Sequence, residues 1–322
     1  MANVEIYVLN VGQADTSILK TPEGNVIVID AVKPRKTKKL LDLIIPNSKV
    51  ASDGKKIISH LIITHPHEDH YSGVQSLLNR YHVQKVILSP FWYETTTNAG
   101  YHNILNLLDS PGSDSSFHFL SGYERIYPDG GTFDSFGKKP LLELLGPSND
   151  ILKELHQCGK LNTNHLSVMT RFTIDRFSMV FAGDAQMENW AQYDNEGMLA
   201  RKCKVLRTAH HGSMNGTQWE RLEKLSPGTV IVSSDPEGRD KLPDLIGAAI
   251  FRKYDTSKSS RKVYLTSRTG TIKLVVSNPA SGRFKTTSYR EEPTKTVPWE
   301  EEKPDIPKTD WDQFIKIHLG LI

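Results

Sequence analysis

The chain has 322 residues, enough for one large domain or two modest ones with a sizeable core. Hydrophobic residues make up 38% and charged residues 24%, which is ordinary for a soluble globular protein. The formal net charge of +3 gives no argument for nucleic acid, and the two cysteines, Cys158 and Cys203, exclude a disulfide framework and indicate reduced thiols.

The N-terminal part of the chain predicts strands followed by a helix. Residues 4–11, 16–20 and 25–30 alternate apolar and polar positions, which predicts three strands, the last two joined in a hairpin. Residues 33–51 begin with a basic run and predict a helix that ends near Pro46. Because the N-terminus lacks a signal-peptide pattern and no run of about 20 apolar residues occurs, we expect a cytoplasmic protein without membrane contact.

The next segment predicts an α/β architecture. A short apolar run at 60–64 indicates a buried strand, which leads straight into a histidine-rich loop. Residues 72–82 have the spacing of a helix, and residues 85–90 indicate another buried strand. This order predicts helices that cover a sheet. We interpret the irregular residues 91–140 as an insertion of loops with a short helix.

A second group of strands is predicted at 141–148, in both halves of 167–185, and at 204–213, 229–234, 262–267 and 271–276. A helix is expected after Asp184. Two separated groups of strands predict two sheets packed face to face. After residue 277 the chain becomes Pro-rich and charged, so we predict a domain at 1–277 and an extension at 278–322. The end of this extension, at 311–322, has roughly helical spacing and either docks on the body or binds a protein partner.

Three histidines and an aspartate lie close together in the loop, as His65, His67, Asp69 and His70. Neutral imidazole suits zinc and other first-row divalent metals, whereas carboxylate suits harder ions. At a strand end, His65 and His67 can converge on one ion, and Asp69 and His70 can serve a second ion nearby. The strand before this loop and the helix after it favour a metal site over a polar surface loop.

This motif resembles the H-x-H-x-D-H signature of the metallo-β-lactamase superfamily. The resemblance implies an αββα sandwich, in which two packed β-sheets are flanked by helices. It also implies two divalent metal ions, with zinc favoured and manganese as the alternative. Further metal ligands implied in chain order are His165 before a strand, Asp184 as the bridge, and a histidine after the next strand. For that last ligand we favour His210, with His211 contacting substrate or acting as a general acid; the reverse order stays open.

Four segments, VGQADTSIL, THPHEDH, FAGDA and AHHGS, resemble one branch of the superfamily, the metallo-hydrolase domain of bacterial DNA-uptake (competence) channel proteins. The segment VYLTSRTGTIKL resembles the closing hairpin of that branch. The resemblance covers about residues 4–276 with gaps in the insertion. The chain departs from the branch at His165, where Asn is common, and at Lys241 and Asp244, where some relatives carry histidines.

Two aspartates, Asp15 and Asp30, close early strands. In this fold such aspartates accept hydrogen bonds from metal-bound histidines and fix the ring orientation; the alternative is an ordinary turn cap. The aromatic residues of the insertion either wall the site or belong to the core: Phe91, Trp92, Tyr93 and Tyr101.

Two ions that share Asp184 imply hydrolysis by a metal-activated hydroxide, which Asp69 orients as a catalytic residue. This chemistry suits phosphodiesters, lactones and thioesters alike. Basic residues cluster at 33–39, 201–207 and 251–262, and they either face solvent or attract phosphates. Together with the branch resemblance they predict a phosphodiesterase or nuclease, with nucleic acid among the phosphodiester substrates. The alternatives are a hydrolase of a small lactone or thioester, and a non-catalytic regulatory module of the same fold.

Overall fold

The computed structural model describes residues 3–90, 99–111, 113–132, 139–157, 162–289 and 309–318. Eight of its strands form one sheet: β1 (Val4–Val8), β2 (Ser17–Lys20), β3 (Val26–Ile29), β4 (Ile57–Ile63), β5 (His82–Leu88), β6 (Ser116–Phe119), β14 (Thr271–Asn278) and β15 (Arg283–Tyr289). Their order across the sheet is β15-β14-β1-β2-β3-β4-β5-β6. The first strand and the last two strands of the chain therefore lie in the same sheet.

A second sheet holds the other seven strands: β7 (Tyr123–Ile126), β8 (Leu141–Leu145), β9 (Met169–Ile174), β10 (Phe177–Phe181), β11 (Val205–Arg207), β12 (Thr229–Val232) and β13 (Lys262–Leu265). Their order is β13-β12-β11-β10-β9-β8-β7. The strands β10, β11, β12 and β13 are parallel to one another, whereas β7, β8 and β9 pair antiparallel.

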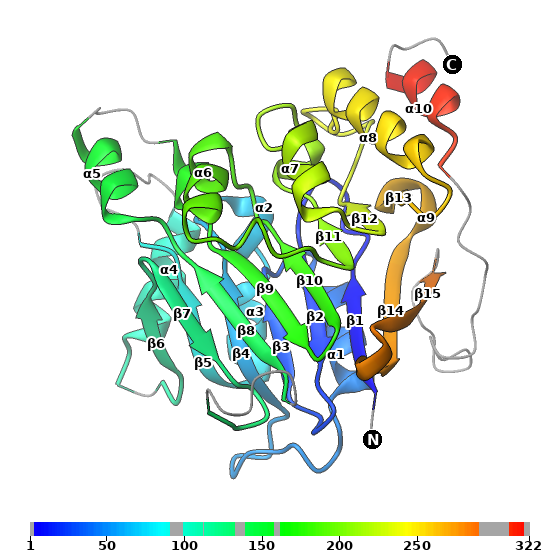
Figure 1. The fold of residues 1–322 in the computed structure, drawn as a ribbon. Coiled ribbons are helices and arrows are strands. Elements are labelled where there is room, and N and C mark those ends of the chain that lie inside the picture. Colours follow the sequence, from blue (N-terminus) through cyan, green and yellow to red (C-terminus); the bar gives the residue numbers. More distant parts are fainter. Residues whose placement is uncertain are drawn as a thin grey trace.

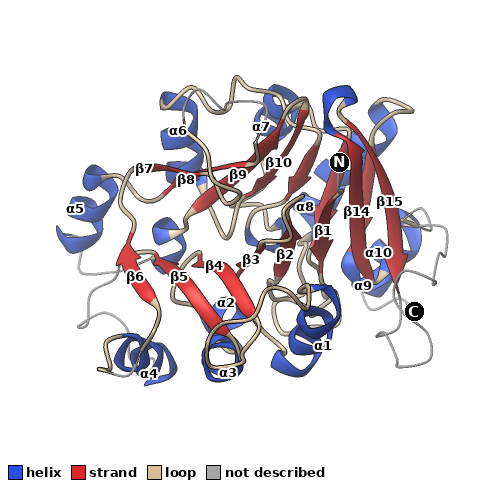
Figure 2. Cartoon of the chain, turned by 90° about the horizontal axis from the view of Figure 1, so that it is seen from below, coloured by secondary structure: helices blue, strands red, loops and turns tan. Residues whose placement is uncertain are grey.

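Helices cover the outer faces of both sheets (Figure 1). The larger ones are α1 (Pro34–Ile44), α3 (Val74–Arg80), α4 (Ala99–Leu108), α5 (Asn149–Gln157), α6 (Met187–Asn195), α7 (Trp219–Leu225), α8 (Leu245–Ser257) and α10 (Trp311–His318). Two single-turn helices, α2 (Glu68–Tyr71) and α9 (Thr266–Thr269), follow strand ends. Figure 2 shows α1, α3 and α4 on one side of the paired sheets, with α6 and α7 on the other. The structure is thus the αββα sandwich predicted from the sequence.

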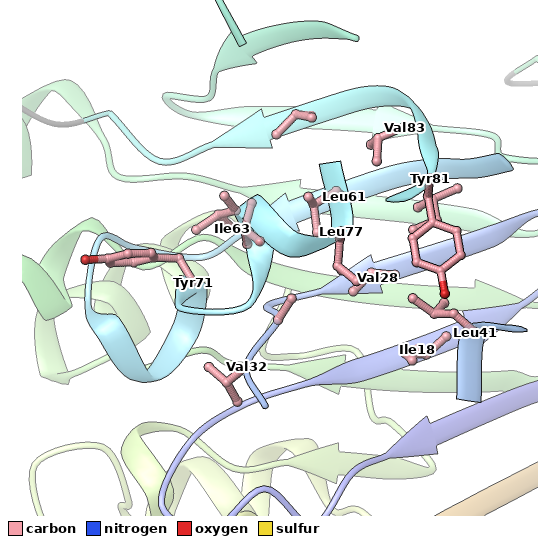
Figure 3. Close-up of a cluster of buried hydrophobic side chains, with 14 of the residues drawn as sticks. Ile18, Val28, Val32, Leu41, Leu61, Ile63, Tyr71, Leu77, Tyr81 and Val83 are labelled. Atoms are coloured by element: carbon pink, nitrogen blue, oxygen red, sulfur yellow. The ribbon is translucent and has the colours of Figure 1, made fainter. Parts of the chain in front are cut away.

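Central strands such as β3 and β10 are buried on both faces, because helices cover one face and the other sheet covers the other, whereas the edge strands β6, β7 and β15 keep exposed residues. Leu61 packs under the helices of the first sheet with Val28 and Leu41, as the close-up in Figure 3 shows. Its neighbour Ile62 points the opposite way, into the core between the sheets. A further cluster fills the space between the second sheet and its helices, with Trp190 among its buried members.

The parallel strands bring three chemically important loops to one edge of the sandwich. β4 is parallel to its neighbours β3 and β5, and β10 is parallel to β11. His65, Asp184 and His210 each follow the carboxyl end of one of these strands, β4, β10 or β11. Loops at the carboxyl ends of parallel strands are the usual place for a site in such sheets.

The predicted closing hairpin is wrong, because β13 and β14 belong to different sheets. After β13 the chain turns through α9 and Gly270, whose φ of 81° lies in the left-handed region, and crosses to the other sheet. There β14 pairs with β1, with Val4 opposite Val276. The apolar pattern identified the strand but could not choose its partner.

The insertion at 91–140 contains more than loops and a short helix. Besides α4, it supplies β6 to the edge of the first sheet and β7 to the edge of the second. Tyr101 is buried in the core against Tyr71, at a ring distance of 5.2 Å. Phe91, Trp92 and Tyr93 lie outside the described residues, so the prediction for them stays a prediction.

Two described parts of the extension at 278–322 are ordered. Strand β15 continues the first sheet beyond β14, and α10 packs on α8 with Trp311 and Phe314 buried. Cys203 is a buried free thiol, whereas Cys158 lies outside the described residues. Among the described helices, none is long and apolar enough to cross a membrane.

Candidate metal centre

The carboxylate of Asp184 lies between two groups of potential metal ligands. Its Oδ2 is 3.7 Å from His65 Nε2, whereas its Oδ1 is 3.3 Å from His70 Nε2. The preceding Gly183 has a φ of 53°, and a Cβ there would lie 3.1 Å from the Thr64 side chain, so this tight turn favours glycine. One carboxylate thus offers one oxygen to each group, which is the arrangement of a bridging ligand.

The first group contains His65 and His67 with Asp184. The Nε2 atom of His65 and the Nδ1 atom of His67 lie 3.0 Å apart. Two nitrogens on one tetrahedral zinc ion, each at about 2.1 Å, lie roughly 3.4 Å apart, so the observed spacing suits a shared ion. On the other side of the His65 ring, Nδ1 lies 3.2 Å from the Thr64 hydroxyl, which fixes the ring.

The second group contains Asp69, His70 and His211 with the other oxygen of Asp184. His211 Nε2 lies 3.3 Å from Asp69 Oδ2 and 3.7 Å from Asp184 Oδ1. His70 and His211 are fully or almost fully buried, whereas the Asp69 side chain is 35% exposed. Asp69 therefore lies on the side of the centre that is open to solvent.

Asp30 fixes the orientation of His70 from behind. Its Oδ2 lies 2.8 Å from His70 Nδ1, and its Oδ1 accepts a hydrogen bond from the Thr64 backbone N–H at 2.8 Å. This contact makes Nδ1 the protonated ring nitrogen and leaves Nε2 for the centre. Asp30 therefore makes the contact that the sequence analysis expected of an orienting aspartate.

Asp15 has a similar position behind His211. Its Oδ1 is 3.6 Å from His211 Nδ1 and forms a buried ion pair with the guanidinium of Arg207. Arg207 also donates hydrogen bonds to the carbonyls of Gly183 and Thr208. These contacts tie the loop after β10 to the end of β11, which are the segments that supply Asp184 and His211.

Of the two neighbouring histidines, His211 and not His210 lies among the potential ligands, which is the order that the sequence analysis left open as the alternative. His211 lies in the second group, whereas His210 lies beside the centre, with its Nε2 3.9 Å from Asp184 Oδ2 and its side chain 22% exposed. Strand β11 ends at Arg207, and both histidines have left-handed backbones with φ of 46° and 51°. The strand alternation used to separate them therefore does not apply. Such a conformation costs roughly 1–2 kcal/mol per residue, so the surrounding contacts must hold it.

His165 lies outside both groups, so its assignment as a metal ligand stays a prediction that this geometry does not support. Its Nε2 is 3.0 Å from Glu188 Oε2 and 3.2 Å from the side-chain nitrogen of Asn162. It belongs to a 3₁₀ turn at Thr163–Leu166, in which successive side chains are rotated by about 120°. Only part of such a turn can face the centre, and sequence spacing does not show which part.

The residues of this turn that do face the centre are Thr163 and Asn164. The Thr163 hydroxyl contacts His67 Nε2, and the Asn164 side-chain nitrogen lies 3.4 Å from His210 Nε2. Asn164 is buried, and its Oδ1 has no hydrogen-bond partner among the described residues. Neither residue was predicted as a site residue from the sequence, although the frequent Asn at this ligand position in the resembled branch was a signal for Asn164.

Burial and neighbouring charges set the protonation of the centre. Burial lowers the pKa of His65 well below its usual range, which keeps the ring neutral, as metal binding requires. Burial also opposes the charge on His70, but the carboxylates of Asp184 and Asp30 outweigh it and raise that pKa. For Asp184 the burial cost is outweighed by His70 and His211, so its pKa is well below the usual range. The bridging position therefore carries a carboxylate.

The residues present fit two divalent ions. Four buried atoms at the centre have no hydrogen-bond partner among the described residues: His70 Nε2, His211 Nδ1, His211 Nε2 and Asp184 Oδ1. Unpaired buried polar atoms are costly, and metal coordination would satisfy the ones that face the centre. Imidazole nitrogens and carboxylate oxygens are ordinary ligands of first-row divalent metals.

The centre opens into a polar cleft of about 930 Å³. Asp69, His210 and His211 lie at its base, and its rim carries two cations, Lys33 and Arg239. Arg239 is highly exposed and pairs with Asp240, whereas Lys33 is an exposed cation at the start of α1. The cleft is also lined by carboxylates, so its lining carries both charges, and Lys33 and Arg239 are the cations that an anionic substrate would meet. These carboxylates are Glu68, Asp69, Asp184, Asp235 and Asp240.

Two of the three basic clusters do not face this cleft. Lys202 and Lys204 precede β11, so they lie at the end of the sheet opposite to the centre, and Arg207 is buried. In the cluster at 251–262, basic residues make structural contacts, such as the ion pair of Arg261 with Glu223. Only the cluster at 33–39 reaches the cleft, through Lys33.

Comparison with known proteins identifies the family. The family model of the metallo-beta-lactamase superfamily matches residues 9–234. No curated protein matches the chain. CmlA, a diiron beta-hydroxylase from Streptomyces venezuelae, has a TM-score of 0.54 at 14% identity, with 89% of this chain and 54% of that chain covered. Tm1679, a metal-dependent hydrolase of the beta-lactamase superfamily, has a TM-score of 0.50 at 14% identity, with 81% and 95% covered.

These structural likenesses establish the fold alone, since the identities are low. The chain spans about half the length of CmlA. The resemblance to the DNA-uptake branch stays a prediction, because these matches do not test it.

Proposed function

Because the chain belongs to the metallo-β-lactamase superfamily, we propose that it is a metal-dependent hydrolase that cleaves phosphodiester bonds with two divalent ions. The observation that carries this proposal is the position of Asp184, whose two oxygens face the two ligand groups. His65 and His67 would hold one ion, while Asp69, His70 and His211 would hold the other. Bound ions of this kind supply Lewis-acid polarisation and a water of lowered pKa.

Zinc is the metal that we propose, because imidazole nitrogens dominate the ligands. Manganese is the alternative, since each group also includes a carboxylate.

The other residues of the centre bind and orient. Asp69 is the carboxylate at the base of the cleft, and we assign it the task of orienting the attacking water. His210 lines the cleft with its Nδ1 2.8 Å from the Ser213 hydroxyl, which fixes the ring. Its Nε2 lies 3.4 Å from the side-chain nitrogen of Asn164, and we assign to it the binding of a substrate oxygen. Buried apolar and backbone groups around His65 and His70 exclude bulk water behind the centre.

The rim of the cleft supports an anionic substrate over a neutral lactone or thioester. Lys33 and Arg239 lie on the rim, and a phosphodiester keeps a negative charge throughout hydrolysis. A lactone has no charge for these cations to attract, so the cations favour the phosphodiester.

Metal analysis and a substrate panel test this proposal. Purified wild-type chain should carry up to two divalent ions and hydrolyse bis-p-nitrophenyl phosphate or single-stranded DNA faster than a lactone or thioester. Asp184→Asn should lose hydrolysis, whereas Asp150→Asn, at a 94% exposed carboxylate on α5, is the matched control. Chain that gains no divalent metal on incubation would overturn the proposal. Turnover of the lactone alone would replace the phosphodiester with a small ester.

A further inference from the structure

A second polar pocket lies beside the cleft of the metal centre. Its volume is about 430 Å³, and it is lined by the loop after β1, the start of α1, the loop after β12 and the helix α9. Three residues, Gly12, Lys33 and Asp235, line both this side pocket and the cleft. The two hollows are therefore neighbours that share one wall.

The side pocket contains three cations, Lys33, Lys36 and Arg268, against the two carboxylates Asp235 and Glu237. The Nη2 atom of Arg268 is buried and has no hydrogen-bond partner among the described residues. Lys36 donates a hydrogen bond from Nζ to the Asn10 carbonyl at 2.8 Å, so its charge is held at the wall. Three cations against two carboxylates, with the half-buried Arg268 among them, suit an oxyanion.

Hydrogen bonds between the lining segments make the pocket rigid. The Ser234 and Ser267 hydroxyls lie 2.8 Å apart, and the Ser234 N–H donates to the Thr266 hydroxyl at 3.1 Å. These contacts join the loop after β12 to α9, which carries Arg268. Across the pocket, Lys33 has a left-handed backbone with a φ of 43°, and such strained residues are concentrated at functional sites.

We propose that this side pocket binds a second phosphate of the substrate, next to the phosphodiester at the metal centre. The inference rests on the proposed function, and it narrows the substrate to a phosphodiester that carries a second phosphate close by; a phosphorylated dinucleotide is the probe. Arg268 is then a specificity-determining residue: its guanidinium donates to the oxygens of the second phosphate, and Lys33 lies between the two phosphates. An isolated diester leaves the pocket unfilled.

The test compares a thymidine dinucleotide that carries a 5′-phosphate with the same dinucleotide without it. Wild-type chain with metal should prefer the phosphorylated form about tenfold in kcat/KM, since one charge-assisted contact is worth about a factor of ten. Arg268→Gln should abolish this preference, whereas Arg268→Lys should keep part of it. Arg283→Gln is the matched control, because Arg283 is an exposed arginine that lines neither hollow.

Calorimetry in the presence of a chelator gives a second readout that needs no hydrolysis. Wild type should bind the phosphorylated dinucleotide about tenfold more tightly than the unphosphorylated one. Arg268→Gln should bind the two equally. Inorganic phosphate should compete with the phosphorylated form at millimolar concentration. If inorganic phosphate binds more tightly than either dinucleotide, the pocket is a site for free phosphate and the inference is overturned.

The two proposals fail in different ways. If neither dinucleotide is hydrolysed but calorimetry keeps the preference and its loss in Arg268→Gln, the phosphodiesterase proposal fails and the anion pocket stands. If both are hydrolysed equally well by wild type and Arg268→Gln, the second-phosphate inference fails and the phosphodiesterase proposal stands.

Discussion

The carboxylate of Asp30 accepts a hydrogen bond from Nδ1 of His70 at 2.8 Å, on the side of the ring away from Asp184. The pair is fully buried, and Asp30 is itself held by the backbone and hydroxyl of Thr64. The hydrogen bond sets which ring nitrogen is free, so it orients a ligand without touching the ion. A residue of this kind should affect metal affinity more than the fold.

Asp30→Asn should weaken the binding of one ion about 10–100-fold. The variant replaces the charged carboxylate that accepts the hydrogen bond of His70 Nδ1 with a neutral amide, so the ring is held less well. The second ion, at His65 and His67, should be affected less. A competition titration with a chromophoric chelator separates the two steps. Asp175→Asn is a matched control, since both aspartates have left-handed backbones, with φ of 55° and 51°. Equal affinities for both variants would contradict the orienting role.

Metal content tests both His211, as a ligand of the second group, and His165, which lies outside the two groups. His211→Gln should bind about one ion fewer per chain and lose most hydrolysis, because His211 belongs to the second group. His165→Gln should keep both ions, since its ring is held by Glu188 away from the centre. Elemental analysis of both variants decides the matter. Loss of an ion from His165→Gln would restore the assignment made from the sequence.

Removal of the Phe314 side chain should destabilise the fold. Phe314 is fully buried where α10 packs on α8, so Phe314→Ala leaves a cavity that costs about 3 kcal/mol. The melting temperature should fall by roughly 5–10 °C. Gln313→Ala, at an exposed position of the same helix, is the control. An unchanged melting temperature for Phe314→Ala would mean that α10 is not docked in solution and is free for a partner.

Stability should fall as the pH decreases from about 6.5 to 4, in part because of His60. Burial, together with the nearby Lys85, lowers the pKa of His60 to about 4, while Glu124 opposes this shift. Between these two pH values the unfolded chain binds a proton that the folded chain does not. The free energy of unfolding therefore decreases as the pH falls. The contribution is about 2 kcal/mol after allowance for solvent screening. Urea unfolding at pH 7 and pH 4.5 measures it, and His60→Gln should show a smaller decrease than wild type. Identical decreases would exclude His60 as a source.

Much of the fold was readable because its signals are local. Buried strands such as β4 and β10 are short apolar runs, and His65 and Asp184 follow directly after them. A ligand that directly follows a strand end needs no long-range information, because the strand fixes where the next residues begin. The same reasoning failed for β14, whose apolar pattern fits either sheet and whose pairing with β1 depends on residues far away in the chain.

The sequence by itself determined the superfamily, the two-sheet sandwich and the residues around which the centre forms, because each is encoded by residue type and short spacing. Only the tertiary structure decided which histidine of each ambiguous segment faces the centre. His165 lies on a 3₁₀ turn, and His210 and His211 have left-handed backbones, so neither segment has a side-chain period that spacing can reveal. The direction of these side chains is set by contacts with distant residues, such as Glu188, Asp15 and Asp184. The same holds for the cations. The sequence showed three basic clusters, but only the structure shows at which end of the sheet each cluster lies. Of the residues in these clusters, Lys33 alone lines the cleft.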